Sequence, residues 1–169
     1  SHLAAGAPRL GVAFGSDLGH LLLSWDMWDI AAPLIEAGCA SMPGDLTLRF
    51  NMGIIHKFRH EWAPCAACFE ELLRHRPDDR ASAWNLGIAA TAQKDWVTAR
   101  RAWRLAGFQI PDGVDDFGQE DEPTPVRLPV VGNDRIKSEV VWARRICPAR
   151  VTIKGVPRFS KMASYGDVV

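Results

Sequence analysis

Long apolar stretches are missing from this sequence of 169 residues. It has no run of about 18 apolar residues, which a membrane-spanning helix would need. The stretch HLLLSW at residues 20–25 is too short for a span, and it lacks the layout of a signal peptide. Because only four cysteines are present without a secretory signal, we expect reduced thiols and a cytoplasmic protein.

Net charge is missing as well, because 20 Lys and Arg residues balance 20 Asp and Glu residues. No overall field therefore draws the chain to nucleic acid or to a membrane surface. The charges are nevertheless segregated along the chain. Residues 112–122 hold six acids and no base, whereas residues 126–169 hold nine Lys and Arg and three Asp and Glu.

Catalytic signatures are absent too. The sequence has no Gly-rich phosphate-binding loop, no GxSxG and no HExxH. Ser160 and Ser164 lie near Lys161, but spacing alone does not make a catalytic site. We therefore expect no enzymatic activity, no cofactor, no metal and no small-molecule substrate.

The sequence does contain an internal repeat with a period of 34 residues. The stretch NMGIIHKFRHEW begins at Asn51, NLGIAATAQKDW begins at Asn85, and a fainter copy lies one period before the first. Such a period predicts stacked units, each too small to bury its own apolar face. The matched pairs include Asp45 and Asp79, Phe50 and Trp84, Gly53 and Gly87, Ile54 and Ile88, Glu61 and Asp95, Trp62 and Trp96, Phe69 and Trp103, and Pro77 and Pro111.

Each unit has the residue pattern of a helix pair. Asp45 and Asp79 follow proline-containing chain breaks, where a carboxylate can cap a first helix by accepting backbone N–H bonds. Gly53 and Gly87 leave room for a neighbouring helix to approach closely. The second helix is then predicted to start at an acid, placed at the positive end of the helix dipole. In the last unit four residues of alternating size share one face of this second helix: Trp96, Ala99, Trp103 and Ala106.

This pattern resembles the tetratricopeptide-repeat (TPR) family. The similarity is carried by the Asn-Leu-Gly-like triplet, the aromatic residue that opens the second helix, the small and aromatic residues that follow it, and the closing proline. It covers residues 80–113 and 46–79 best, and 12–45 more faintly. The resemblance implies a mainly α fold, in which residues 1–111 form an α-solenoid of three helix hairpins wound into a right-handed superhelix.

Three features depart from the family's pattern. His56 and His60 occupy positions where the family usually has an aromatic and a small residue. Pro33 falls inside the predicted second helix of the first repeat, where we expect it to kink the helix or to delay its start. In addition, no amphipathic helix follows Pro111 to cover the last repeat, as such arrays normally require.

The remaining third of the chain changes character after an acidic linker at residues 112–125. Residues 126–169 are rich in Val and Ile, and the segments PVRLPVV, EVVWARRI, RVTIKGV and GDVV predict a small β-meander. We expect this β-rich unit to cover the third repeat, the alternative being a solvated unit that is simply tethered. Because the sequence stops at YGDVV within an apolar pattern, we also expect the native chain to continue beyond Val169.

The TPR resemblance implies that the first helix of each repeat lines a concave groove. An asparagine there can hold a peptide backbone with both its donor and its acceptor, and apolar neighbours would form the floor. The alternative is that the apolar residues pack against the chain's own N-terminus or β-rich unit. The candidate partner-binding residues are Phe50, Asn51, Ile54, Lys57, Phe58, Trp84, Asn85 and Ile88, with Asp17, His20 and Thr91 as further groove positions.

A carboxylate clamp of the kind found in one TPR subtype is not expected. That clamp uses Lys and Arg from several first helices, and of the corresponding residues here only Asn51 fits. The five residues at those places are Ser16, His20, Asn51, Ala81 and Asn85.

The stretch HKFRHEWAPCAAC contains four side chains of zinc-ligand type. His56 and His60 are spaced i, i+4, and Cys65 and Cys68 are spaced i, i+3. Cys65 nevertheless holds the small-residue position that packs the two helices, and a buried cysteine is an ordinary small hydrophobe. A redox CxxC pair would need a βαβ setting rather than a helix hairpin. We therefore expect neither a metal site nor a redox site.

A basic run in the β-rich unit, WARRICPAR, offers Trp142, Arg144, Arg145 and Arg150. Basic residues beside an aromatic on a small sheet are suited to RNA or single-stranded DNA. The alternative, which we favour at this point, is a solvated strand face with structural ion pairs.

The sequence therefore predicts a non-catalytic scaffold or adaptor of a bacterial cytoplasm, which binds a protein or peptide in a concave groove. Two other functions stay open. One is an obligate subunit or chaperone-like partner of a larger complex. The other is nucleic-acid binding through the basic β-rich unit.

Overall fold

The computed structural model describes residues 27–113, 117, 122–133 and 135–169. The chain divides into two compact units, one ending at Pro111 and the other beginning at Asp112. Residues 12–26 of the first predicted repeat, with the groove positions Asp17 and His20, lie outside the described residues.

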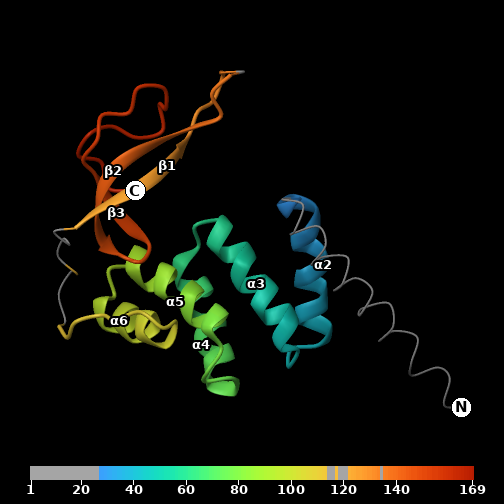
Figure 1. Ribbon diagram of the computed structural model, residues 1–169. Coiled ribbons are helices and arrows are strands. Elements are labelled where there is room, and N and C mark those ends of the chain that lie inside the picture. The colour runs from blue at the N-terminus through green and yellow to red at the C-terminus, as the bar shows by residue number, and fades with distance from the viewer. Residues whose placement is uncertain (1–26, 114–116, 118–121, 134) are drawn as a thin grey trace, which may run out of the picture. The chain divides into compact units, whose positions relative to one another are not determined.

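The helical unit contains five helices among its described residues (Figure 1). Each helix contacts the next along the chain, and α3 also contacts α5, so the helices stack as successive hairpins. Their bounds are α2 (Trp28–Ser41), α3 (Leu46–Phe58), α4 (Trp62–His75), α5 (Arg80–Ala92) and α6 (Trp96–Leu105). The hairpins α3–α4 and α5–α6 correspond to the second and third predicted repeats.

Aspartates cap three of these helices, as the sequence predicts. The Asp45 carboxylate accepts the N–H groups of Thr47 at 2.8 Å and Leu48 at 3.0 Å at the start of α3. Asp79 accepts the N–H of Ala81 at 3.1 Å at the start of α5, and Asp95 caps α6. These bonds satisfy backbone donors that have no partner inside a helix.

The helices α3 and α5 end in the same unusual turn. His60 and Lys94, one period apart, both adopt a left-handed backbone conformation with φ of 58° and 61°. The residue after each of them donates its N–H back into the helix, to His56 O at 2.8 Å and to Ala90 O at 2.9 Å. Glycine is the usual residue in this conformation, so both repeats place a side chain where one is disfavoured.

Glycine at one position of each repeat lets an aromatic ring cross directly over the helix. A Cβ atom on Gly53 would lie 2.7 Å from Phe69 Cζ, and one on Gly87 would lie 2.7 Å from the indole of Trp103. Phe69 and Trp103 are both completely buried. The predicted close approach of the paired helices is therefore confirmed.

Pro33 does not delay the start of α2, because the helix begins at Trp28 and runs through the proline to Ser41. The start of α2 differs from those of α3, α5 and α6 in another respect. Met27 at its N-cap position makes no side-chain capping bond.

The second unit contains a three-stranded antiparallel sheet with the order β1-β2-β3. Its strands are β1 (Pro123–Pro129), β2 (Ser138–Cys147) and β3 (Arg150–Ile153), so β1 begins three residues before the predicted start of the β-rich unit at residue 126. The predicted fourth segment also pairs, because Val168 bridges Thr152 beside β3.

One face of this sheet is covered, and the opposite face is exposed. Leu128, Val141, Ala143 and Ile153 form a buried cluster together with Ala163. On the other face Val140 and Trp142 remain 57% and 59% exposed. The alternation of buried and exposed residues along the middle of β2 is that of a strand with one face covered.

Glu139 fixes the loop that lies over the covered face. Its carboxylate accepts the N–H groups of Arg158 and Phe159, each at 2.9 Å, and also that of Ser160. These bonds, that of Arg158 first, hold the pKa of the Glu139 carboxyl below its ordinary value.

Candidate functional site

The eight candidate partner-binding residues lie on α3 and α5, the first helices of the two described hairpins. Five come from α3 and three from α5, and their spacing places each group on one helix face. The groups lie close together, because α3 contacts α5 directly. We call this surface the inner face: Phe50, Asn51, Ile54, Lys57, Phe58, Trp84, Asn85 and Ile88.

Exposure divides the inner face into two kinds of residue. Phe58 and Trp84 are exposed, at 52% and 39%, whereas Phe50, Ile54 and Ile88 are half-buried. Asn51 and Asn85 are 2% and 6% exposed, so their amides lie beneath the surface. The exposed apolar groups are those that a partner would meet first.

A polar connection joins the two helices at the centre of this surface. Lys57 Nζ on α3 donates to Asn85 Oδ1 on α5 at 2.8 Å, and Asn85 Nδ2 donates to the carbonyl of Ala81 at 2.8 Å. The Lys57 ammonium also lies 5.1 Å from the centre of the Phe58 ring. Burial lowers the pKa of Lys57, with a smaller opposing effect from Cys65. Asn85 therefore already uses both its acceptor and its donor within the chain.

The aromatic side chains of the inner face rest on the second helices of their own hairpins. Phe50 meets Phe69 edge-to-face, with ring centres 5.4 Å apart. Trp84 meets Trp103 in the same way at 5.2 Å, and it also contacts Phe108 at 5.5 Å. Such pairs fix the ring positions, so both aromatics are held in place before any partner arrives.

The His and Cys residues of HKFRHEWAPCAAC do not gather at one point. His56 Nδ1 bonds a carboxylate oxygen of Glu61 at 2.5 Å, while His60 stacks on Trp62 with ring centres 5.2 Å apart. Cys65 is fully buried in the helix interface, as predicted for a small hydrophobe. In the part of the chain that the structure describes, no three His, Cys, Asp or Glu side chains are grouped to hold a metal ion.

Burial also disfavours the thiolate form of three cysteines. It raises the pKa of Cys65 to about 11, with a further contribution from Cys68. The pKa values of Cys39 and Cys68 are likewise raised by burial, and these two line one small pocket of about 130 Å³ with Arg49. Because the thiolate is the reactive form, these cysteines lack the environment of nucleophiles.

Comparison with known proteins identifies the fold of the helical unit. No family model matches the chain, and no sequence among curated proteins matches it. Solved structures do match. Two mutants of MamA align with TM-scores of 0.53, at 18% and 20% identity, over 57% and 60% of this chain. MamA AMB-1 aligns with a TM-score of 0.52 at 16% identity over 56%.

The helical unit has a TPR-like fold. At these identities the likeness concerns the fold alone. This chain spans 70% of the length of one MamA mutant chain, 56% of the other and 52% of MamA AMB-1. Among the described residues, no helix reaches the length and apolarity that a membrane crossing requires.

The residues of the basic run WARRICPAR do not all lie on one face of the sheet. Trp142 and Arg144 share the exposed face of β2, whereas the register pairs Arg145 with buried Val151. Arg145 Nη1 donates to the carbonyl of Pro148 at 3.3 Å, and Arg150 pairs with Cys147 at the turn. Of the four residues predicted from the sequence, the structure keeps two together.

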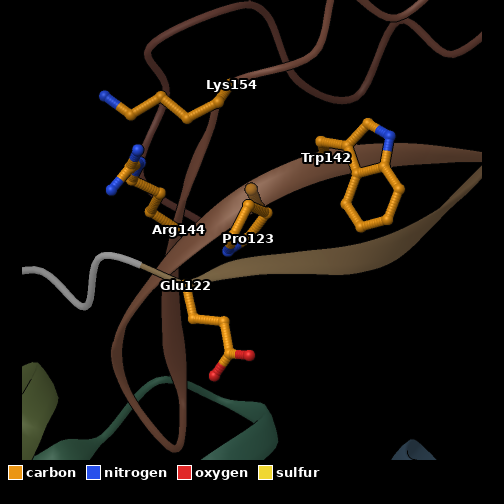
Figure 2. A pocket seen from close by; sticks show the side chains of 6 residues that line it. Glu122, Pro123, Trp142, Arg144 and Lys154 are labelled. Atoms are coloured by element: carbon orange, nitrogen blue, oxygen red, sulfur yellow. The ribbon is translucent and has the colours of Figure 1, made fainter.

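A third basic side chain, Lys154, joins Trp142 and Arg144. A pocket of about 530 Å³ on this face is lined by Glu122, Pro123, Trp142, Ala143, Arg144 and Lys154. Figure 2 shows Arg144 and Lys154 on one side of Pro123 and Trp142 on the other. Sequence spacing could not reveal Lys154, because the turn between β2 and β3 brings it beside Trp142.

Proposed function

We propose that the helical unit is a non-catalytic interaction module, which binds a segment of a partner protein on its inner face in the cytoplasm. The supporting observation is the pair of exposed aromatics, Phe58 and Trp84, on the adjacent first helices of a TPR-like fold. Lys57, a half-buried cation, lies beside the Phe58 ring.

The chemistry of the inner face suggests the kind of segment that it binds. Phe58 and Trp84 offer flat apolar surface, and half-buried Ile54 and Ile88 extend it along the two helices. The Lys57 ammonium is partly desolvated, so a carboxylate on the partner would gain more from it than from a fully hydrated lysine. An apolar segment with an acidic side chain matches both features.

Asn85 positions the Lys57 side chain on the inner face. Since its amide bonds Lys57 and the carbonyl of Ala81, it holds the ammonium in place between the two helices. Backbone capture by Asn51 and Asn85 stays a prediction, and changing either buried amide would also disturb the fold. Variants of exposed residues therefore test binding more cleanly.

The proposal also implies no catalytic role for this surface. Lys57 is the one titratable side chain among the eight inner-face residues. A nucleophile with an adjacent base, which covalent catalysis requires, is not among them.

Affinity capture with matched surface variants tests this function. The immobilised chain is incubated with lysate of its native cell, and retained proteins are identified by mass spectrometry for wild type, Phe58→Ser and Val97→Ser. Val97 on α6 is 60% exposed and serves as the matched control. We expect Phe58→Ser to lose the specific partner and Val97→Ser to keep it, with similar thermal melting of both.

Equal retention by the two variants would exclude the inner face as the binding surface. Loss in both variants would point instead to a surface that includes α6.

A further inference from the structure

The exposed face of the three-stranded sheet gathers an aromatic ring and two cations. Trp142 and Arg144 lie two positions apart on β2, so their side chains leave the sheet on the same side. Lys154 is fixed beside them, because its backbone N–H donates to the carbonyl of Trp142 at 2.8 Å. The three residues line one pocket of about 530 Å³.

The Trp142 ring is available to a ligand along one side. Its side chain is 59% exposed, and Pro123 and Pro125 of β1 lie across from Arg144 and Trp142 in the register. Proline rings are rigid and apolar, so they widen the apolar surface beside the indole. Figure 2 shows the indole standing beside Pro123 at the edge of the pocket.

The positive charge of the second unit is concentrated in residues 126–169, whereas the six acids of residues 112–122 precede the sheet. Residues 126–169 hold nine Lys and Arg against three Asp and Glu. Two of those acids are engaged by backbone N–H groups, Glu139 with the loop at residues 158–160 and Asp167 with Ser164 at 2.7 Å. Glu122 also lines the pocket, but its carboxylate extends away from Arg144 and Lys154 (Figure 2).

The sheet edges are poorly suited to a peptide strand. Pro123, Pro125 and Pro129 lie at positions of β1 whose backbone N–H groups would point away from β2. Because proline has no N–H, the outer edge of β1 lacks most of its hydrogen-bond donors. The edge of β3 is occupied by the chain itself, since Val151 exchanges backbone bonds of 2.8 and 3.0 Å with Val169. Of the surfaces of the sheet itself, the exposed face is therefore the one open to a ligand.

We propose that this face binds single-stranded nucleic acid, with a base stacked on Trp142 and backbone phosphates contacted by Arg144 and Lys154. Every base has a π-face, so one exposed indole accepts any sequence, and adjacent cations bind the phosphates on either side. An acidic peptide would use the same cations but would gain little from a single flat ring. This site is independent of the function proposed for the inner face.

Binding of labelled oligonucleotides to the full chain tests the proposal. The probes are oligo-dT and oligo-rU of about 15 nucleotides, which matches the upper end of common binding-site sizes. Fluorescence anisotropy at several salt concentrations should show binding that weakens with salt. With two phosphate contacts, the slope of log affinity against log salt should be about −1.4. Similar affinities for both probes would indicate that the protein does not distinguish ribose from deoxyribose. A higher affinity for one probe would identify that nucleic acid as the ligand.

Variants then separate stacking from charge. Trp142→Ala should weaken binding roughly 5- to 100-fold, whereas Trp142→Phe should keep most of the affinity because it keeps a stacking ring. Lys154→Gln should reduce the salt slope by about 0.7. Lys161→Gln, which removes the same charge from an exposed loop position, is the matched control and should leave both quantities unchanged.

Two results would overturn the proposal. One is absence of binding to either probe at low salt by a chain that melts normally. The other is binding that polyglutamate displaces fully and that Trp142→Ala does not change, since this would identify an acidic-peptide surface. Phe58→Ser on the inner face should leave oligonucleotide binding intact, so failure here and failure of the inner-face function are distinguishable.

Discussion

Replacement of Gly87 by alanine tests how the paired helices depend on close approach. The added Cβ would lie 2.7 Å from two indole carbons of Trp103 and 2.8 Å from a third, whereas ordinary contact begins at 3.4 Å. The ring cannot move aside easily, because it is completely buried and packs edge-to-face on Trp84 and Phe108. Its Nε1 also donates to Thr91 Oγ1 at 3.2 Å.

The expected change in the free energy of unfolding follows from two opposing effects. Overpacking a well-packed core costs about 1–3 kcal/mol. Alanine gains back about 1 kcal/mol relative to glycine inside a helix. We therefore expect Gly87→Ala to destabilise the helical unit by up to about 2 kcal/mol, measured by urea unfolding with far-UV circular dichroism.

Gly44→Ala provides the matched control. Gly44 precedes α3, and nothing lies within 4 Å of an added Cβ there. This variant should be neutral or slightly stabilising, by up to about 1 kcal/mol. If Gly87→Ala unfolded at the same urea concentration as Gly44→Ala or later, the packing account of the repeat would be wrong.

Further predictions concern a cap, a turn, a carboxylate and a thiol. Asp79→Ala should destabilise by about 1 kcal/mol through loss of the α5 cap, while Asp78→Ala beside it should be neutral in the same urea assay. Lys94→Gly should stabilise by up to about 1 kcal/mol, because it relieves a left-handed conformation; unchanged or lower stability would contradict this. Because folding lowers the pKa of Glu139, its hydrogen bonds stabilise the folded state fully above the ordinary pKa of 4.5. That stabilisation is lost as pH falls through the folded-state pKa. Proteolysis of the loop at residues 158–160 should therefore rise on acidification in wild type, and at all pH values in Glu139→Gln. Because the pKa of Cys65 is raised to about 11 and the thiol is buried, iodoacetamide should modify it at pH 8 only after unfolding.

Packing features with a local cause were predictable from the sequence. Gly87 and Trp103 lie 16 positions apart within one repeat, and their twins Gly53 and Phe69 repeat the arrangement, so the period revealed the contact. The aspartate caps were equally visible, since a cap depends on residues two or three positions away.

Features that depend on neighbouring repeats or on strand register were not predictable. The bond from Lys57 to Asn85 joins residues 28 positions apart on different helices, so the pattern could not show that Asn85 is already engaged. The left-handed turn at His60 was hidden because the residue there is not glycine. In the β unit, the pairing of β2 with β3 brings Lys154 beside Trp142, 12 positions earlier in the chain.

Amide hydrogen exchange of the helical unit, with and without the captured partner, tests the central claim most directly. Mass spectrometry of peptic fragments reports which helices become protected. Binding on the inner face predicts slower exchange in α3 and α5, with α4 and α6 unchanged. Protection confined to α4 and α6, or to the β unit, would contradict the account.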